Sequence, residues 1–336
     1  MHAETLPATA LSYGEAIREG FSWLMSRHPE VFVIGQGLWS PWYVGNSMTD
    51  LDKQFGRERV LDTPVSEAAC TGAALGAALC GYRPIVVHPR MDFMLLAVDQ
   101  IVNQAAKWRH MLGGESGPRL TIRGIVNRGG EQGAQHSQSL HAWFAHIPGL
   151  RVVMPASPGD ARDLLIASVL CDDPVLYIDD RWLYDEHEPT GPPRVLDLRT
   201  ERPERRREGS DVTLVGSSWS THLALRAAES LATRGISCDV WDLRVLNPLE
   251  VDDILSSVKR TGRLCVIDGG WRTCGLAGEI CARAAESLSS RVWRASPLRI
   301  TLPDAPAPTS AVLEASYYPD VNTIVSRVAA SVGVPP

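Results

Sequence analysis

The sequence lacks the features that mark secreted and membrane-spanning proteins. Its seven cysteines are scattered and form no C-x-x-C pair, which argues against a disulfide framework and against a zinc site. The longest apolar run, residues 68–82, is too short and too rich in Gly and Ala to span a bilayer. The first residues contain no charged stretch followed by an apolar one, so no signal peptide is expected.

A basic surface is also missing. The formal net charge is −6, and no stripe of Lys and Arg is available to displace counterions from a nucleic acid. Charged residues make up 21% of the chain, which argues against disorder. Unpatterned free thiols are typical of a reducing compartment. The sequence therefore predicts a cytoplasmic protein that binds neither membranes nor nucleic acid.

What the chain does contain is a regular alternation of strands and helices. With 336 residues, 44% of them hydrophobic, it can form roughly two domains. Continuous Val/Ile/Leu strands separated by helices are typical of a parallel sheet covered on both faces. In the first half, the predicted strands are 31–35, 84–88, 120–124, 151–155 and 174–179, and the predicted helices are 12–27, 66–79, 95–111 and 158–170.

A break in this alternation divides the chain. Residues 186–210 are rich in Pro and charge and have little that could build a core, so they are predicted to be a linker. Alternation then resumes, with strands predicted at 212–216, 238–243, 264–268 and 292–296. We therefore predict two α/β domains with mostly parallel sheets, residues 1–185 and 211–336, joined by the linker 186–210.

The segment LDTPVSEAACTGAALGAAL is unusual because it has almost no large side chains. Ser66 is suited to be a helix N-cap, which places Glu67 in the first helical turn. Gly72 and Gly76 would let another backbone approach closely. Two interpretations remain open, a tightly packed core helix or an interface helix that carries a positioned carboxylate at its start.

Two later segments complete the pattern. MDFMLLAVDQIVNQAAKWRHM is an amphipathic helix with Phe93 near its start, and NRGGEQGAQHSQSLHAWFAHIPGL is a Gly-rich stretch that contains His136. By itself, a histidine in a Gly-rich loop is more often an ordinary polar residue than a catalyst. His141 and His146 fall in a predicted helix, 139–146, and are expected to be structural.

The order and spacing of these segments resemble the beta subunits of thiamine diphosphate-dependent 2-oxo acid dehydrogenases of the pyruvate, branched-chain and acetoin types. That family reads D-T-P-I-S-E, then F-x-x-x-x-x-D-Q-I-V-N-Q-A-A-K, then G-A-Q-H-S-Q with A-W-F-A-H-x-P-G-L. The equivalents here are residues 62–67, 93–107 and 133–150. DLRVLNPLE in the second half is similar to the family's D-L-R-T-L-x-P-x-D, so the resemblance extends from Ser12 to Val325.

The resemblance implies a pyrimidine-binding transketolase-like domain followed by a transketolase C-terminal-like domain. It implies an enzyme that decarboxylates a 2-oxo acid on thiamine diphosphate and transfers the acyl unit to a lipoyl group. Enzymes of this class hold the diphosphate through Mg²⁺ with a G-D-G segment, and none occurs here. The Mg²⁺ ligands are therefore expected from an alpha subunit, in a heterotetramer of two alpha and two beta chains, and a lipoyl acyltransferase or carrier protein is a further expected partner.

The resemblance also assigns roles to individual residues. Glu67 corresponds to the carboxylate that hydrogen-bonds the 1′ nitrogen of the aminopyrimidine and so promotes loss of the thiazolium proton. Phe93 matches the aromatic residue that packs against the pyrimidine, and Val65 and Gln36 match residues that line the same pocket. His136 matches the histidine that acts on the intermediate and assists acyl transfer, a role that suits an imidazole near neutral pH.

Several positions depart from the family pattern. A family carboxylate after the first strand is replaced by Gln36, and Arg90 and Arg128 occupy positions that are mostly neutral or acidic in the family. These changes are either compensating substitutions or signs of a different anionic substrate or acceptor, held by an arginine fork. The segment that matches a family potassium site, residues 168–173, has Cys171 where Asp is common, which argues against this site.

Two other functions stay open at this level. A specialised biosynthetic relative would transfer a two-carbon unit to a sugar, an aldehyde or a carrier-protein thiol. A non-catalytic scaffold would only support its alpha partner, although the presence of Glu67 and His136 speaks against it.

Overall fold

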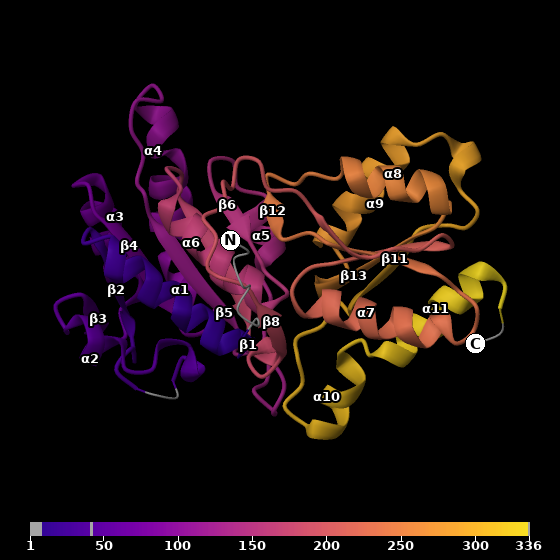
Figure 1. The fold of residues 1–336 in the computed structure, drawn as a ribbon, viewed down its shortest axis with the longest axis horizontal. Coiled ribbons are helices and arrows are strands. Elements are labelled where there is room, and N and C mark those ends of the chain that lie inside the picture. The colour runs from indigo at the N-terminus through magenta and orange to yellow at the C-terminus, as the bar shows by residue number, and fades with distance from the viewer. Residues whose placement is uncertain (1–8, 41–42, 335–336) are drawn as a thin grey trace, which may run out of the picture. The chain divides into compact units, whose positions relative to one another are not determined.

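The computed structural model describes residues 9–40 and 43–334, which divide into two compact units (Figure 1). Unit 1 is drawn from residues 1–89, 93–125 and 157–199, and unit 2 from residues 90–92, 126–156 and 200–336. Among the described residues, no helix is long and apolar enough to cross a membrane.

Unit 1 is built on strands in the order β7-β5-β4-β2-β3. β2 pairs in parallel with both β3 and β4, and β4 pairs in parallel with β5. Every residue of β5 and β7 is buried, as expected for strands covered on both faces. The strands are β2 (Val31–Gln36), β3 (Val60–Thr63), β4 (Arg83–His88), β5 (Thr121–Val126) and β7 (Val175–Asp180), and β1 (Thr9–Ser12) forms a separate antiparallel pair with β8 (His187–Thr190).

The helices of unit 1 have clear local causes. α1 begins with a capping box in which the Ser12 hydroxyl accepts from the Glu15 N–H and the Glu15 carboxylate accepts from the Ser12 N–H. α6, which packs against α1, is capped by Ser157 and has Pro158 in its first turn. The helices are α1 (Tyr13–Arg27), α2 (Leu51–Phe55), α3 (Glu67–Leu79), α4 (Ala106–Met111) and α6 (Pro158–Leu170), the 3₁₀ turns are η1 (Gly45–Met48), η2 (Phe93–Ala97) and η4 (Arg181–Leu183), and η3 (Asp99–Ala105) is a π-helix.

Unit 2 contains a second sheet in the order β14-β13-β10-β11-β9, parallel except for the edge strand β9. α7 and α11 lie on one face of this sheet, and α8 and α9 lie on the other (Figure 1). The strands are β9 (Glu204–Arg207), β10 (Val212–Gly216), β11 (Cys238–Asp242), β13 (Leu264–Trp271) and β14 (Leu298–Leu302), with an antiparallel pair of β6 (Arg151–Val153) and β12 (Val245–Asn247). The helices are α5 (His141–Ala145), α7 (Trp219–Ala232), α8 (Asp252–Thr261), α9 (Leu276–Ser287), α10 (Ala311–Tyr317) and α11 (Val321–Val332), with a 3₁₀ turn η5 (Ser290–Val292).

The predicted fold class of two α/β parts with mostly parallel sheets is confirmed. Two local predictions are wrong. Residues 292–296 form no strand, because the chain leaves η5 and reaches β14 only at Leu298. The single helix predicted at 95–111 consists of η2, η3 and α4 in succession. The segment 186–210 contains the short strands β8 and β9.

Candidate functional site

Four of the five predicted site residues follow the carboxyl ends of three neighbouring strands in unit 1. Gln36 ends β2, Val65 and Glu67 follow β3, and Phe93 follows β4. Because β2 pairs in parallel with both β3 and β4, these three ends meet at one edge of the sheet. Ligands of open α/β sheets bind at the carboxyl ends of the strands. The fold therefore brings these four residues to one place.

Glu67 is the first residue of α3, and Ser66 occupies the N-cap position as predicted, although the Ser66 side chain makes no capping hydrogen bond. The Glu67 side chain is half-buried, and no described residue forms a hydrogen bond or an ion pair with its carboxylate. The N-terminal end of a helix favours a negative charge. Glu67 is thus a carboxylate held in a favourable field and available to a ligand.

The base of α3 is fixed to β4 by Thr71, whose hydroxyl lies 3.2 Å from Nε2 of His88. His88 is buried, and this burial lowers its pKa to about 4. The imidazole is therefore neutral near pH 7 and holds the helix without adding a charge beneath Glu67.

Apolar side chains flank this carboxylate. Val65 is 67% exposed and Phe93 is 37% exposed, although both belong to residue types that are usually covered. η2, which begins at Phe93, packs against α3. An exposed aromatic ring and an exposed Val beside an available carboxylate suit a flat heteroaromatic ligand with a polar edge.

Gln36 lies where the chain turns sharply after β2. Its Nε2 donates to the Tyr43 hydroxyl at 2.7 Å. Asp62 Oδ1 accepts from the N–H groups of Gly37 at 2.6 Å and Leu38 at 3.2 Å, which holds the turn. Gly37 has a φ of +70°, and a Cβ there would collide with the Tyr43 ring. Gln36 is therefore oriented by the turn and does not replace the missing family carboxylate with another charge.

His136, the fifth predicted residue, belongs to unit 2 and lies half-buried in the loop 127–140. Its N–H donates to the carbonyl oxygen of Gly133 at 3.3 Å. Earlier in the loop, the Glu131 N–H donates to Glu314 Oε2 at 2.9 Å, and the Ala311 N–H donates to Glu131 Oε1 at 3.1 Å. The loop is thus tied to the start and middle of α10.

The sequence did not reveal two features of this loop. Two residues after His136, the Gln138 N–H donates to the buried carboxylate of Asp92 at 3.0 Å. His141, expected to be structural, lies between Ser139 and Asp268, at 2.9 Å from each. The only signal in the sequence was the presence of a polar residue, Asp92 or His141, within an otherwise apolar segment.

Arg90 and Arg128 also belong to unit 2. Arg128 is buried, and its Nη1 donates to the carbonyl oxygen of Gly269 at 3.3 Å. Arg90 is half-buried, and both arginines make further interactions within the fold. A contact of either side chain with an anionic substrate or acceptor stays a prediction.

The segment matched to a potassium site does not fit a potassium ion. Arg83 Nη1 donates to the carbonyl oxygens of Val169 at 2.8 Å and Cys171 at 3.1 Å, and Arg109 Nη2 donates to that of Asp172 at 2.8 Å. Two guanidinium groups therefore already occupy these carbonyl oxygens. Elsewhere, no cluster of three or more His, Cys, Asp or Glu side chains among residues 9–40 and 43–334 could hold a metal ion.

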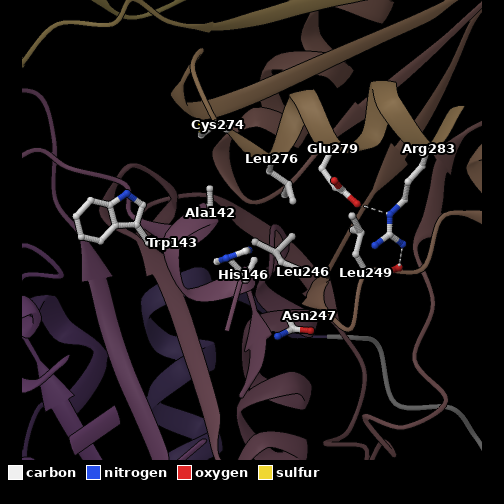
Figure 2. A pocket seen from close by; sticks show the side chains of 12 residues that line it. Ala142, Trp143, His146, Leu246, Asn247, Leu249, Cys274, Leu276, Glu279 and Arg283 are labelled. Atoms are coloured by element: carbon white, nitrogen blue, oxygen red, sulfur yellow. Dashed lines mark hydrogen bonds and ion pairs between the residues drawn. The ribbon is translucent and has the colours of Figure 1, made fainter. Parts of the chain in front are cut away.

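Unit 2 also has a cavity of about 720 Å³ beside α5 and α9 (Figure 2). On its α9 side, Arg283 Nε pairs with Glu279 Oε1 at 2.7 Å, and Arg283 Nη1 donates to the Leu249 carbonyl oxygen at 2.7 Å. Trp143 and His146 contribute from the α5 side. None of the five predicted site residues lines this cavity.

Known families account for both halves of the chain. The family described as transketolase, pyrimidine binding domain matches residues 9–185, and the family described as transketolase, C-terminal domain matches residues 201–324. The acetoin:2,6-dichlorophenolindophenol oxidoreductase subunit beta of Bacillus subtilis is 37% identical, with 98% of this chain and 99% of that protein covered. The mitochondrial pyruvate dehydrogenase E1 component subunit beta of Homo sapiens is 31% identical, with 96% and 91% covered. This chain belongs to the family of 2-oxo acid dehydrogenase beta subunits.

A solved structure agrees on the fold. A split-gene transketolase, described as an inactive beta4 tetramer, superposes with a TM-score of 0.74 at 20% sequence identity, with 97% of this chain and 99% of that chain covered. The beta-subunit family is thiamine diphosphate-dependent, and its members work with an alpha subunit. The residues at the sheet edge fit the pyrimidine half of that cofactor, since the Glu67 carboxylate has no hydrogen-bond or ion-pair partner among the described residues and the Phe93 side chain is 37% exposed.

Proposed function

We propose that this chain, with an alpha subunit, decarboxylates a 2-oxo acid and transfers the acyl unit to a lipoyl group. The observation that carries the proposal is the half-buried carboxylate of Glu67, without a partner among the described residues, at the start of α3 and beside the exposed Phe93 and Val65. Thiamine diphosphate, when bound, supplies the nucleophilic carbon that attacks the 2-oxo acid.

In this proposal Glu67 hydrogen-bonds the 1′ nitrogen of the aminopyrimidine and holds a proton there. A charge-assisted hydrogen bond in a water-poor site is short and strong, and the N-terminal end of α3 stabilises the charged carboxylate. Phe93 packs on a ring face, while Val65 and Gln36 line the pocket and orient the ring. His136 is the acid–base group that moves a proton during transfer to the acceptor.

The alpha partner is supported by uncovered apolar side chains on unit 1. Four apolar side chains just before α3, at its end and in η2 are exposed by 37–67% of their surface, namely Val65, Leu79, Phe93 and Leu96. A Cβ added to Gly76 in α3 would meet nothing within 4 Å. Exposed apolar side chains gathered on neighbouring elements mark protein interfaces. We propose that this face receives the alpha subunit, which supplies the Mg²⁺ ligands, in an assembly of two alpha and two beta chains.

We propose that residues 1–185 act as the pyrimidine-binding domain, that residues 211–336 act as the C-terminal domain, and that residues 186–210 link them. The acyl acceptor is a lipoyl group on an acyltransferase, or else a carrier protein. The matches over residues 9–185 and 201–324 support this division.

The test is co-expression with an alpha subunit followed by a screen of 2-oxo acids. Decarboxylation is measured with 2,6-dichlorophenolindophenol as the electron acceptor and then with lipoamide, with the beta chain alone as control. We expect turnover only in the assembled complex, and acyl transfer to lipoamide with the preferred 2-oxo acid. A complex that binds the cofactor but decarboxylates no 2-oxo acid contradicts the proposal. Transfer to a sugar or aldehyde instead of lipoamide would contradict the proposed acceptor and support the proposed decarboxylation.

A further inference from the structure

Unit 2 contains three buried side chains that are hydrogen-bonded in series next to the loop of His136. The Ser139 hydroxyl lies 2.9 Å from His141 Nδ1, and His141 Nε2 lies 2.9 Å from Asp268 Oδ1. Ser139 and Asp268 are 4% exposed and His141 is 1% exposed. Ser139 closes the loop 127–140, His141 begins α5, and Asp268 lies in β13. These two hydrogen bonds therefore join the loop to the central sheet of unit 2.

The hydrogen bonds around Asp268 show which nitrogen of the imidazole donates to it. Asp268 Oδ1 also accepts from the Gly270 N–H at 2.9 Å, and Oδ2 accepts from the Ala277 N–H at 3.0 Å. Burial alone would raise the pKa of Asp268, but His141 and these N–H groups hold it below the usual value. An ionised carboxylate only accepts hydrogen bonds, so His141 Nε2 donates and Nδ1 faces the Ser139 hydroxyl.

The same three residue types form nucleophilic triads in hydrolases, but access excludes that role here. A nucleophilic serine must reach a substrate, whereas the Ser139 side chain is enclosed and does not line the cavity of unit 2. Simple stabilisation is also a poor explanation, because a buried carboxylate and its hydrogen-bonding partner often contribute no more than apolar residues of the same volume. What such a pair does provide is a defined geometry.

These hydrogen bonds fix the C-terminal end of the loop 127–140. A Cβ on Gly270 would lie 3.1 Å from His141 Cε1, so the imidazole is closely packed against β13 as well as bonded to it. Asp92 holds the Gln138 N–H, one residue before Ser139. The segment that follows His136 is therefore fixed at two successive positions by two buried carboxylates, one of which reaches the loop only through His141.

We propose that His141 is a positioning residue that fixes the loop of His136 to β13 through Ser139 and Asp268. The inference rests on the transfer role proposed for His136. Since His141 touches neither substrate nor cofactor in this role, it sets where His136 lies and not which proton His136 moves. Loss of the bond to Asp268 loosens the loop and leaves a buried carboxylate without one of its donors.

Three substitutions in the alpha–beta complex separate the two bonds of the imidazole. H141Q places an amide nitrogen near the position of Nε2 and retains donation to Asp268. H141N reaches only the position of Nδ1, and H141A removes both bonds. H146A, at the exposed end of α5, is the matched control.

We expect H141A and H141N to lower acyl transfer to lipoamide about ten- to a hundredfold, in line with the loss of a hydrogen bond to a charged group. The KM for the 2-oxo acid should change less than about twofold, because binding of the substrate in the ground state is not altered. H141Q should recover acyl transfer to within about threefold of wild type, because it retains donation to Asp268. H146A should match wild type. Equal impairment of H141Q and H141A, or a wild-type transfer rate in H141A, overturns the proposal.

Hydrogen–deuterium exchange on the same complexes gives a readout that needs no turnover. Amides of residues 133–140 should exchange faster in H141A and H141N than in wild type and H141Q, while those of α1 and β5 should not change. If the wild-type complex has no 2-oxo acid activity, the proposed function fails, and the exchange pattern still decides whether His141 fixes the loop. Unchanged exchange at residues 133–140 in H141A contradicts the inference whatever the activity.

Discussion

The backbone N–H of Gln138 donates to Oδ1 of Asp92 at 3.0 Å, which joins the segment just before η2 to the loop of His136. Asp92 is 4% exposed, and its second oxygen, Oδ2, has no hydrogen-bond partner among the described residues. Burial raises the pKa of the Asp92 carboxyl, against the opposing effects of Gln138 and His136. The fold therefore buries the Asp92 carboxyl close to His136, at a cost to its charged form.

This carboxyl leads to a pH-dependent prediction. A raised pKa in the folded state means that the folded chain binds a proton more readily than the unfolded one. The stabilising contribution is therefore present at low pH and is lost as the pH rises through the folded pKa. D92N keeps an oxygen for the Gln138 N–H and removes the charge. We expect D92N to unfold at a higher urea concentration than wild type near pH 7, and the gain to shrink near pH 4. A gain that grows toward acid pH would contradict this reading.

Glu67 gives the prediction on which the proposed chemistry depends most. E67Q keeps the size of the side chain but cannot carry the charge that holds a proton on the pyrimidine. We expect turnover of the alpha–beta complex to fall by about a hundredfold or more. Because no described residue pairs with this carboxylate, E67Q loses only the interaction with the N-terminal end of α3, worth about 0.3–1 kcal/mol, and the thermal midpoint should fall by no more than about 4 °C. E229Q on the exposed face of α7 is the control, and E67Q turnover above roughly a tenth of wild type would refute the role.

His88 should shape the acid limb of the stability profile. Its pKa is lowered from 6.5 to about 4 by burial. The folded state resists the proton that the unfolded state accepts, so the stabilising contribution is complete above about pH 6.5 and is lost as the pH falls toward about 4. The full difference is worth about 3 kcal/mol. H88Q can keep a bond to Thr71 but cannot titrate, so its free energy of unfolding should fall less than that of wild type between these pH values. Parallel pH curves for the two proteins would remove His88 as the cause.

Arg83 leads to a prediction about monovalent ions. Since its guanidinium already donates to the carbonyl oxygens of Val169 and Cys171, replacing K⁺ by Na⁺ should leave the thermal midpoint of wild type unchanged. R83M frees both carbonyl oxygens. It should melt at a lower temperature and regain part of the loss in K⁺ but not in Na⁺. A wild-type protein that is destabilised on removal of K⁺ would show that the guanidinium does not serve in place of an ion.

Local signals predicted much of the fold and part of the site. The buried runs of β2, β4, β5 and β7 are apolar enough to be read directly, and Ser66 followed by Glu67 indicates a helix start. β3 was missed because its four residues, Val60–Thr63, are too few and include a polar Asp. η3 was predicted as ordinary helix because a π-helix has almost the same apolar pattern.

The site could be predicted only in part, because several of its contacts join residues that are far apart in the sequence. His141 and Asp268 are 127 residues apart in the sequence, and nothing near either residue indicates the other. Arg83 and Cys171 are separated by 88 residues in the sequence. The hydrogen bond from the Arg83 guanidinium to the Cys171 carbonyl oxygen could therefore not be predicted from the segment matched to a potassium site. In contrast, the alternation of strands and helices predicted a parallel sheet, in which Gln36 at the end of β2 and Phe93 after β4 lie at the same edge.

The division of the chain into units has a practical consequence for truncation. Residues 126–156 belong to unit 2 although they precede β7 of unit 1. A fragment starting at residue 200 would lack α5 and β6, so β12 would lose its antiparallel neighbour and Asp268 its imidazole. Proteolytic nicking within residues 186–210 should therefore yield two pieces that stay associated through residues 126–156, and the C-terminal piece should not refold alone.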